Sequence, residues 1–205
     1  MTNSSPTRED ALALLYEYTQ SDSLRRHALG VEQAMWKMAE KYNGNSDEWG
    51  LTGLLHDFDY EMYPTLEDHP YKGNKILKEQ GYPESICNAI MGHATYTGVP
   101  RDTDMAKALF AVDELTGFIF AVTYVRPSKS ILEVQPKSVK KKLKQRSFAA
   151  SVNRDDIFQS IDELDVDMTE HIQFVIDALK EKAEELGLKG DGQLSFTGYR
   201  SYNLV

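Results

Sequence analysis

Four side chains in this sequence are of the types that bind divalent metal ions. They are His27, the adjacent pair His56 and Asp57, and Asp113. Each falls on the inward stripe of a predicted amphipathic helix. A buried carboxylate or imidazole without a partner is energetically costly, so we expect these groups to pair with one another or to share a cation. Nitrogen and oxygen donors of this kind suit manganese, iron, nickel, cobalt, zinc or magnesium.

The elements that must position these residues are all predicted to be helices. Apolar residues recur at spacings of three and four, capping residues precede the periodic stretches, and no run of alternating residues is long enough for a substantial sheet. The predicted helices span about residues 7–19, 22–42, 46–58, 68–77, 83–93, 102–124 and 168–187. We therefore expect an all-α fold in which separate helices bring the four side chains together.

The position of each candidate within its helix matters for metal binding. Neighbouring residues of an ideal helix project about 100° apart. His56 and Asp57 can therefore grip one ion together only where a helix ends, and they stand in the last turn of the helix predicted from Ser46. Asp113 lies in the middle of an apolar stripe with Leu109, which is an unfavourable place for a carboxylate that has no partner.

An early histidine, a histidine–aspartate doublet and a later aspartate on successive helices resemble the pattern of the HD-domain metal-dependent phosphohydrolase superfamily. The resemblance covers about residues 22–125. The stretches that carry it are Arg26-His27, Leu54-Leu55-His56-Asp57 and Ala111-Val112-Asp113-Glu114-Leu115. It implies an HD-type helical bundle with extra C-terminal helices, in which His56 and Asp57 form the catalytic centre. The ligands of the first metal ion would be His27, His56, Asp57 and Asp113.

Two more histidines fall where family members with binuclear sites place theirs. The stretches are His69-Pro70-Tyr71-Lys72-Gly73 and Ile90-Met91-Gly92-His93. By resemblance, Asp57 would bridge to a second ion bound by His69 and His93. Ala94 follows His93, however, so the paired histidine of some relatives is missing. One ion is therefore the count that the sequence favours, and two ions are the alternative.

The residues after the doublet depart from common family sequences. The run Phe58-Asp59-Tyr60 stands where many members have Ile-Gly-Lys. This departure disfavours a cyclic-di-GMP phosphodiesterase of the HD-GYP type, and we expect an HDIG-like member instead. Asp59 and Glu61 are either partners that support the metal ligands or simply acids of a turn, and the sequence favours the turn.

The donor set predicts a particular chemistry. A bound cation lowers the pKa of water toward neutrality and polarises a phosphoryl oxygen, which are the requirements of phosphoester hydrolysis by metal-activated water. The non-bridging oxygens also need cationic partners, for which Arg26, Lys72 and Lys129 are the candidates. We therefore expect a phosphomonoesterase or phosphodiesterase whose substrate is a small phosphorylated metabolite or nucleotide.

Two other functions remain open. Members of the same superfamily that resemble myo-inositol oxygenase use a di-iron centre with comparable ligands to activate dioxygen. Alternatively, the chain is a regulatory module in which the metal fixes the fold and a phosphorylated ligand is held without turnover. Metal analysis and phosphate release separate these functions.

The expected domain organisation is one HD-type helical domain over residues 1–188, followed by a tail, 189–205. The parts of the domain are the motif-bearing core 22–125, the basic segment 126–146 and the C-terminal helices 150–188. The basic segment carries eight lysines and arginines against Glu133 alone, so its formal charge is +7. Such a segment fits either a solvated helix or the capture of an anion.

Composition sets the remaining expectations. A formal net charge of −9 over 205 residues disfavours wholesale binding to nucleic acid or to anionic membranes. Cys87 is the only cysteine, and the polar first ten residues do not resemble a secretory signal, so we expect a cytoplasmic protein. The most apolar stretch, 106–125, is interrupted by charged residues and predicts a buried helix rather than a membrane span. The sequence does not specify an oligomeric state.

Overall fold

The structure, a computed structural model, describes residues 6–190. The helices are, in chain order, α1 (Arg8–Tyr18), α2 (Asp22–Tyr42), α3 (Ser46–Leu55), α4 (Tyr71–Glu79), α5 (Glu84–His93), α6 (Asp104–Tyr124), α7 (Pro136–Leu143), α8 (Arg154–Leu164) and α9 (Met168–Glu181). Two short 3-10 segments are η1 (Thr95–Thr97) and η2 (Ile131–Glu133). No strand occurs in the described range, and the expected all-α fold is confirmed.

Helix α3 starts at Ser46 as predicted, but its end differs from the predicted range 46–58, and its cap differs from the Ser46 cap that the sequence suggests. Asn45, rather than Ser46, is the N-cap, because its side-chain oxygen accepts hydrogen bonds from two backbone amides of the first turn. The helix ends at Leu55, so His56 is its C-cap and Asp57 lies in the turn beyond it. The doublet therefore sits where the helix opens, rather than within its last turn.

The end of α9 also differs from the prediction. The helix begins as expected after Asp167, whose carboxylate accepts from two amides of the first turn. It ends at Glu181, and turns lead on to Gly187. These turns direct Leu186 and Leu188 into the core, where both are almost fully buried, so apolar burial overrides continuation of the helix.

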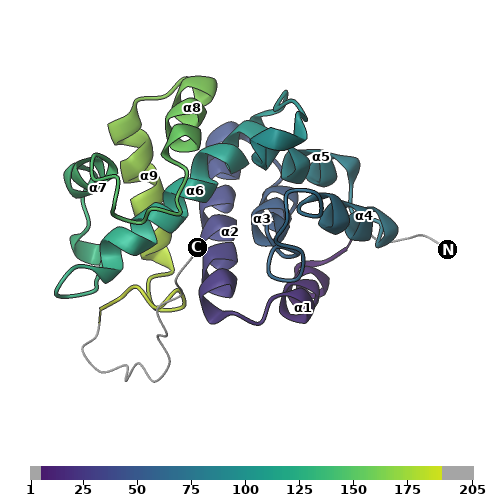
Figure 1. The fold of residues 1–205 in the computed structure, drawn as a ribbon, viewed down its shortest axis with the longest axis horizontal. Coiled ribbons are helices and arrows are strands. Elements are labelled where there is room, and N and C mark those ends of the chain that lie inside the picture. Colours follow the sequence, from purple (N-terminus) through teal and green to yellow (C-terminus); the bar gives the residue numbers. More distant parts are fainter. Residues whose placement is uncertain (1–5, 191–205) are drawn as a thin grey trace.

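Two long helices, α2 and α6, lie side by side at the centre of the molecule (Figure 1). Helices α1, α3, α4 and α5 lie on one side of this pair, and α7, α8 and α9 lie on the other. Fully buried residues such as Met35 on α2 and Phe118 on α6 belong to one continuous apolar core. The candidate ligands come from α2, from α6 and, on the α3–α5 side, from the end of α3, the turns that follow it and the end of α5.

A glycine lets α3 approach α2 closely. A Cβ atom at Gly53 would lie 2.9 Å from the backbone oxygen of Val31 and equally close to Met35. No larger residue fits there without separating the two helices. This close contact fixes the end of α3, and with it His56, against the centre of the fold.

In residues 6–190, no helix is both long and apolar enough to cross a lipid bilayer. The most apolar one, α6, is buried among the other helices. The basic segment 126–146 contains η2 and α7. Its place within one domain over 1–188 stays a prediction, and the expected tail lies almost entirely outside the described residues.

Candidate metal centre

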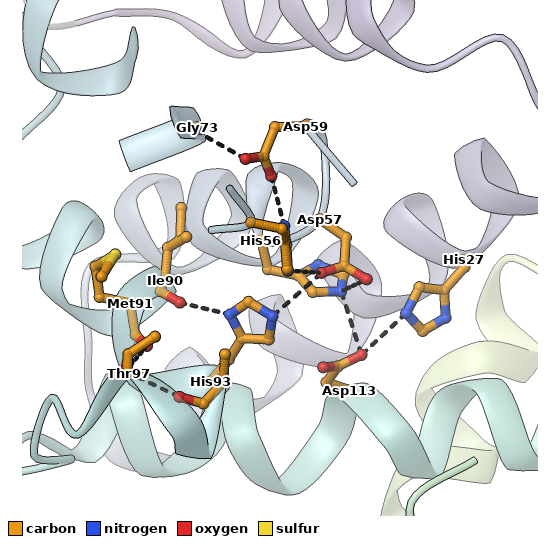
Figure 2. A network of polar contacts seen from close by, with 12 residues as sticks. His27, His56, Asp57, Asp59, Gly73, Ile90, Met91, His93, Thr97 and Asp113 are labelled. Atoms are coloured by element: carbon orange, nitrogen blue, oxygen red, sulfur yellow. Dashed lines mark hydrogen bonds and ion pairs between the residues drawn. The ribbon is translucent and has the colours of Figure 1, made fainter. Parts of the chain in front are cut away.

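Side chains from α2, α6 and the end of α3 converge on one point. The Nε2 atom of His27 lies 3.0 Å from Oδ1 of Asp113. The Nε2 atom of His56 lies 3.2 Å from that same oxygen and 3.4 Å from Oδ2 of Asp57. Figure 2 shows these side chains directed toward one another. One donor atom from each of the four residues lies within 4.8 Å of the others, and we call this set the first donor group.

A second set of donors meets the other oxygen of Asp57. Its Oδ1 atom lies 3.2 Å from Nε2 of His69 and 3.1 Å from Nε2 of His93. These three residues also offer donor atoms within 4.8 Å of one another, and we call them the second donor group. Asp57 belongs to both groups, so one carboxylate joins two neighbouring sites.

The histidines are held in a defined tautomer. Nδ1 of His56 lies 2.8 Å from the carbonyl oxygen of Gly53, and Nδ1 of His93 bonds to the carbonyl oxygen of Ile90 (Figure 2). A carbonyl oxygen only accepts, so each Nδ1 must carry the hydrogen. In the neutral ring, Nε2 then presents a lone pair toward the carboxylates. Donation from the other ring nitrogen to a fixed acceptor is the usual arrangement of metal-binding histidines.

His56 gives the strongest indication that these residues fit a cation. Its side chain is fully buried, and its Nε2 atom makes no hydrogen bond within the described residues, although two carboxylate oxygens lie near it. A buried polar atom without a partner is costly. A lone pair that faces carboxylate oxygens is favourable only when a proton or a metal ion lies between them. The residues present therefore fit a bound cation.

Asp59 orients the second donor group by bonding to the ring nitrogen of His69 that does not face Asp57. Its carboxylate is 1% exposed and accepts hydrogen bonds of 2.8 Å from Nδ1 of His69 and from the backbone N–H of Gly73. The interpretation of Asp59 as a mere turn acid is therefore wrong. Gly73 is required for this contact, because a Cβ atom there would lie 2.6 Å from Cγ of Asp59. Glu61, in contrast, stabilises a turn: its carboxylate accepts hydrogen bonds from the backbone amides of Gln20 and Ser21, between α1 and α2.

In both donor groups, the carboxylates and the imidazoles shift one another's pKa values toward the charged forms. Burial lowers the pKa of His56, but the charges of Asp57 and Asp113 outweigh it and hold that pKa well above 6.5. Burial also lowers the pKa of His69, but the carboxylates of Asp57 and Asp59 outweigh burial and raise that pKa to about 9. Burial raises the pKa of Asp57, yet the histidines around it hold that pKa well below its usual range. Protons thus fill the positions that cations would take.

Glu114 is a neighbour whose role the sequence did not reveal. It follows Asp113 in the quoted motif, and burial together with the charge of Asp113 raises its pKa to about 8. Its carboxylate accepts from the backbone N–H of Asn153 at 3.2 Å, which ties α6 to the start of α8. The contact depends on long-range packing, so no local pattern could have predicted it.

The residues predicted to bind phosphate have other partners or surroundings. Nζ of Lys72 lies 3.0 Å from Asp68 and 4.5 Å from the centre of the Tyr63 ring. The guanidinium of Arg26 lies against Gly187, 3.3 Å from where a Cβ atom would stand. Lys129 is exposed in the loop after α6. Their contact with a substrate stays a prediction.

The expectation that the chain lacks the Gly-Tyr-Pro tripeptide of the HD-GYP type is wrong, because Gly81-Tyr82-Pro83 is such a tripeptide. Only the run after the doublet then disfavours that type. The tripeptide forms the turn between α4 and α5, with φ of 81° at Gly81 and Pro83 as the N-cap of α5. The side chain of Tyr82 is buried. The HDIG-like subtype stays a prediction.

Comparison with known protein families matches residues 24–116 to the model of the HD domain. No curated protein and no solved structure matches the chain. The matched range contains both donor groups. Its ends lie close to His27 and Asp113, the outermost residues of the first group.

Proposed function

Since the chain carries an HD domain over residues 24–116, we propose that it is a metal-dependent phosphohydrolase that acts on a small phosphorylated metabolite or nucleotide. The observation that supports this most is the shared carboxylate of Asp57, which faces histidine Nε2 atoms on both of its oxygens. Such an arrangement suits two neighbouring divalent ions, as in many enzymes that cleave phosphoesters.

The donor groups assign the ligands of each ion. The first ion would be held by His27, His56, Asp57 and Asp113, and the second by Asp57, His69 and His93. The donor atoms of each group lie within 4.8 Å of one another, and ligand atoms bonded to one ion at about 2.1 Å lie within about 4.2 Å of one another. When bound, divalent ions lower the pKa of water and polarise a phosphoryl oxygen.

The protein's own residues would fix the geometry of this chemistry. Asp57 sets the spacing of the two sites because its two oxygens face different histidines. The carbonyl oxygens of Gly53 and Ile90 hold His56 and His93 in the tautomer that offers Nε2. A side chain held in this way loses little conformational entropy when its ligand binds.

Phosphate release from a substrate panel tests the proposal. The panel comprises nucleotides, sugar phosphates and cyclic nucleotides, assayed with manganese, nickel, cobalt, zinc or magnesium and with EDTA. We expect metal-stimulated release that Asp57→Ala abolishes without loss of helical circular dichroism. Asp102→Asn, a change at an exposed acid outside both donor groups, should leave the rate unchanged. Full activity of Asp57→Ala would remove the proposal.

A di-iron oxygenase is the second candidate, because a bridging carboxylate with several histidines also suits a pair of iron ions. Two iron ions per chain together with substrate-dependent oxygen consumption would favour it over hydrolysis. A regulatory module that holds a phosphorylated ligand without turnover is the third, and an intact nucleotide that survives purification would favour it. The cytoplasmic location and the role of the basic segment 126–146 stay predictions.

A further inference from the structure

Three partly exposed tyrosines gather around His69. They are Tyr60 in the turn after the doublet, Tyr71 at the start of α4 and Tyr96 in η1, with exposed fractions of 38%, 42% and 45%. Tyr60 and Tyr96 contact His69 directly, and Tyr71 follows His69 by two residues in the chain; we call the three residues the tyrosine wall.

Two of these rings are fixed in place although they are exposed. The hydroxyl of Tyr96 donates to the backbone oxygen of His69 at 2.8 Å. The ring of Tyr60 stands edge-on to the imidazole of His69, with centroids 5.4 Å apart and an interplanar angle of 83°. Fixed aromatic rings offer flat apolar faces that lose little entropy when a ligand covers them.

The wall adjoins the second donor group. His69 contacts Tyr60 and Tyr96, and its Nε2 atom lies 3.2 Å from Oδ1 of Asp57. The wall is thus adjacent to a phosphoryl group that this centre would hold. The neighbouring turn exposes two further apolar side chains, Met62 and Leu66, together with the acids Glu61 and Glu67.

We propose that Tyr60, Tyr71 and Tyr96 form a subsite for a flat aromatic ring in the organic part of the substrate. The inference that the substrate carries a phosphoryl group rests on the proposed function, whereas the inference of a ring subsite depends on the tyrosine wall alone. Ring-bearing phosphoesters would thus be preferred over those of small aliphatic alcohols. Stacking on tyrosine faces supplies the preference, at about two- to tenfold in affinity for each ring engaged.

Binding of two phosphonates tests the subsite without relying on hydrolysis. Phenylphosphonate and methylphosphonate carry the same anionic group, and their carbon–phosphorus bond withstands phosphoester hydrolysis. Titration calorimetry with the full chain in manganese should show tighter binding of phenylphosphonate. Tyr96→Leu and Tyr60→Leu should lower its affinity several-fold and leave methylphosphonate unchanged, while Tyr96→Phe keeps most of the preference.

Tyr16→Leu is the matched control, because Tyr16 is 48% exposed and packs against Arg25 on the outside of the fold. It should not change either affinity. Manganese content measured on each variant shows whether His69 still binds its ion. Equal affinities of the two phosphonates, no binding of either, or an equal loss in Tyr16→Leu would overturn the subsite. A phenylphosphonate preference without phosphate release from phenyl phosphate would instead overturn only the proposed hydrolysis.

Discussion

Replacement of Asp59 by asparagine perturbs the second donor group while every proposed ligand stays in place. The wild-type carboxylate is buried and accepts two hydrogen bonds of 2.8 Å, from Nδ1 of His69 and from the N–H of Gly73. Asparagine has nearly the same shape but offers one oxygen, and its NH2 group would face the second donor. The variant therefore loses the negative charge behind His69 and leaves one buried donor without an acceptor.

The expected loss follows from these two contacts. A hydrogen bond to a charged group contributes about 1.5–3 kcal/mol, and an unsatisfied buried donor costs about 1–3 kcal/mol. Loss of a partner that orients a metal-binding histidine lowers metal affinity about 10- to 100-fold, which corresponds to about 1.4–2.8 kcal/mol. We therefore expect the ion at His69 to bind Asp59→Asn about 10- to 100-fold more weakly. The ion of the first donor group, whose ligands do not contact Asp59, should bind as before.

Titration calorimetry with manganese on protein treated with EDTA and dialysed measures both affinities. The melting temperature of the same samples separates a loss of metal affinity from a loss of folding. Glu61→Gln is the matched control, because the Glu61 carboxylate accepts from backbone amides of the α1–α2 turn. A folded Asp59→Asn variant that binds manganese as tightly as the wild type would refute the orienting role.

Three further outcomes are expected. Gly73→Ala should reproduce the metal-binding loss of Asp59→Asn in the same titration, since its Cβ atom would meet the Asp59 carboxylate at 2.6 Å. In the metal-free protein, where the pKa of His69 is raised from 6.5 to about 9, the charged ring stabilises the fold fully below pH 6.5, and this stabilisation is lost as pH rises through 9. A metal ion must displace the proton of His69, so the affinity of the second donor group for manganese should rise by about tenfold per pH unit from pH 7 to 9 and then level off. An affinity that does not change with pH would contradict this. Arg101→Met removes bonds of 2.6–2.7 Å to Glu163 and to the carbonyl next to His93, and urea denaturation should show a loss of about 1.5–3 kcal/mol.

Helix positions were largely predictable because they depend on local properties. Periodic apolar residues and caps place the predicted helix 22–42 at the observed bounds of α2, and 102–124 within two residues of α6. The pairing of His27 with Asp113 was also expected, since polar groups on two buried stripes need partners. The 3.0 Å contact between them results from the packing of α2 against α6, which no local pattern specifies.

The supporting residues were not predictable in the same way. Asp59 looks like an acid in a turn, and its burial against His69 depends on the close approach of Gly73 from α4. Tyr96 looks like an exposed aromatic residue, and its link to His69 arises only when η1 packs beside the start of α4. Such contacts depend on how loops fold over the site, and loop geometry is weakly encoded in periodicity.

The number of divalent ions per chain tests the shared-carboxylate centre most directly. Protein reconstituted with manganese and dialysed would be measured by plasma mass spectrometry, alongside His93→Gln and Asp57→Asn. We expect two ions in the wild type, one in His93→Gln and a loss from both sites in Asp57→Asn. A folded wild type that retains no ion, or an Asp57→Asn variant that retains both, would contradict a centre built on Asp57.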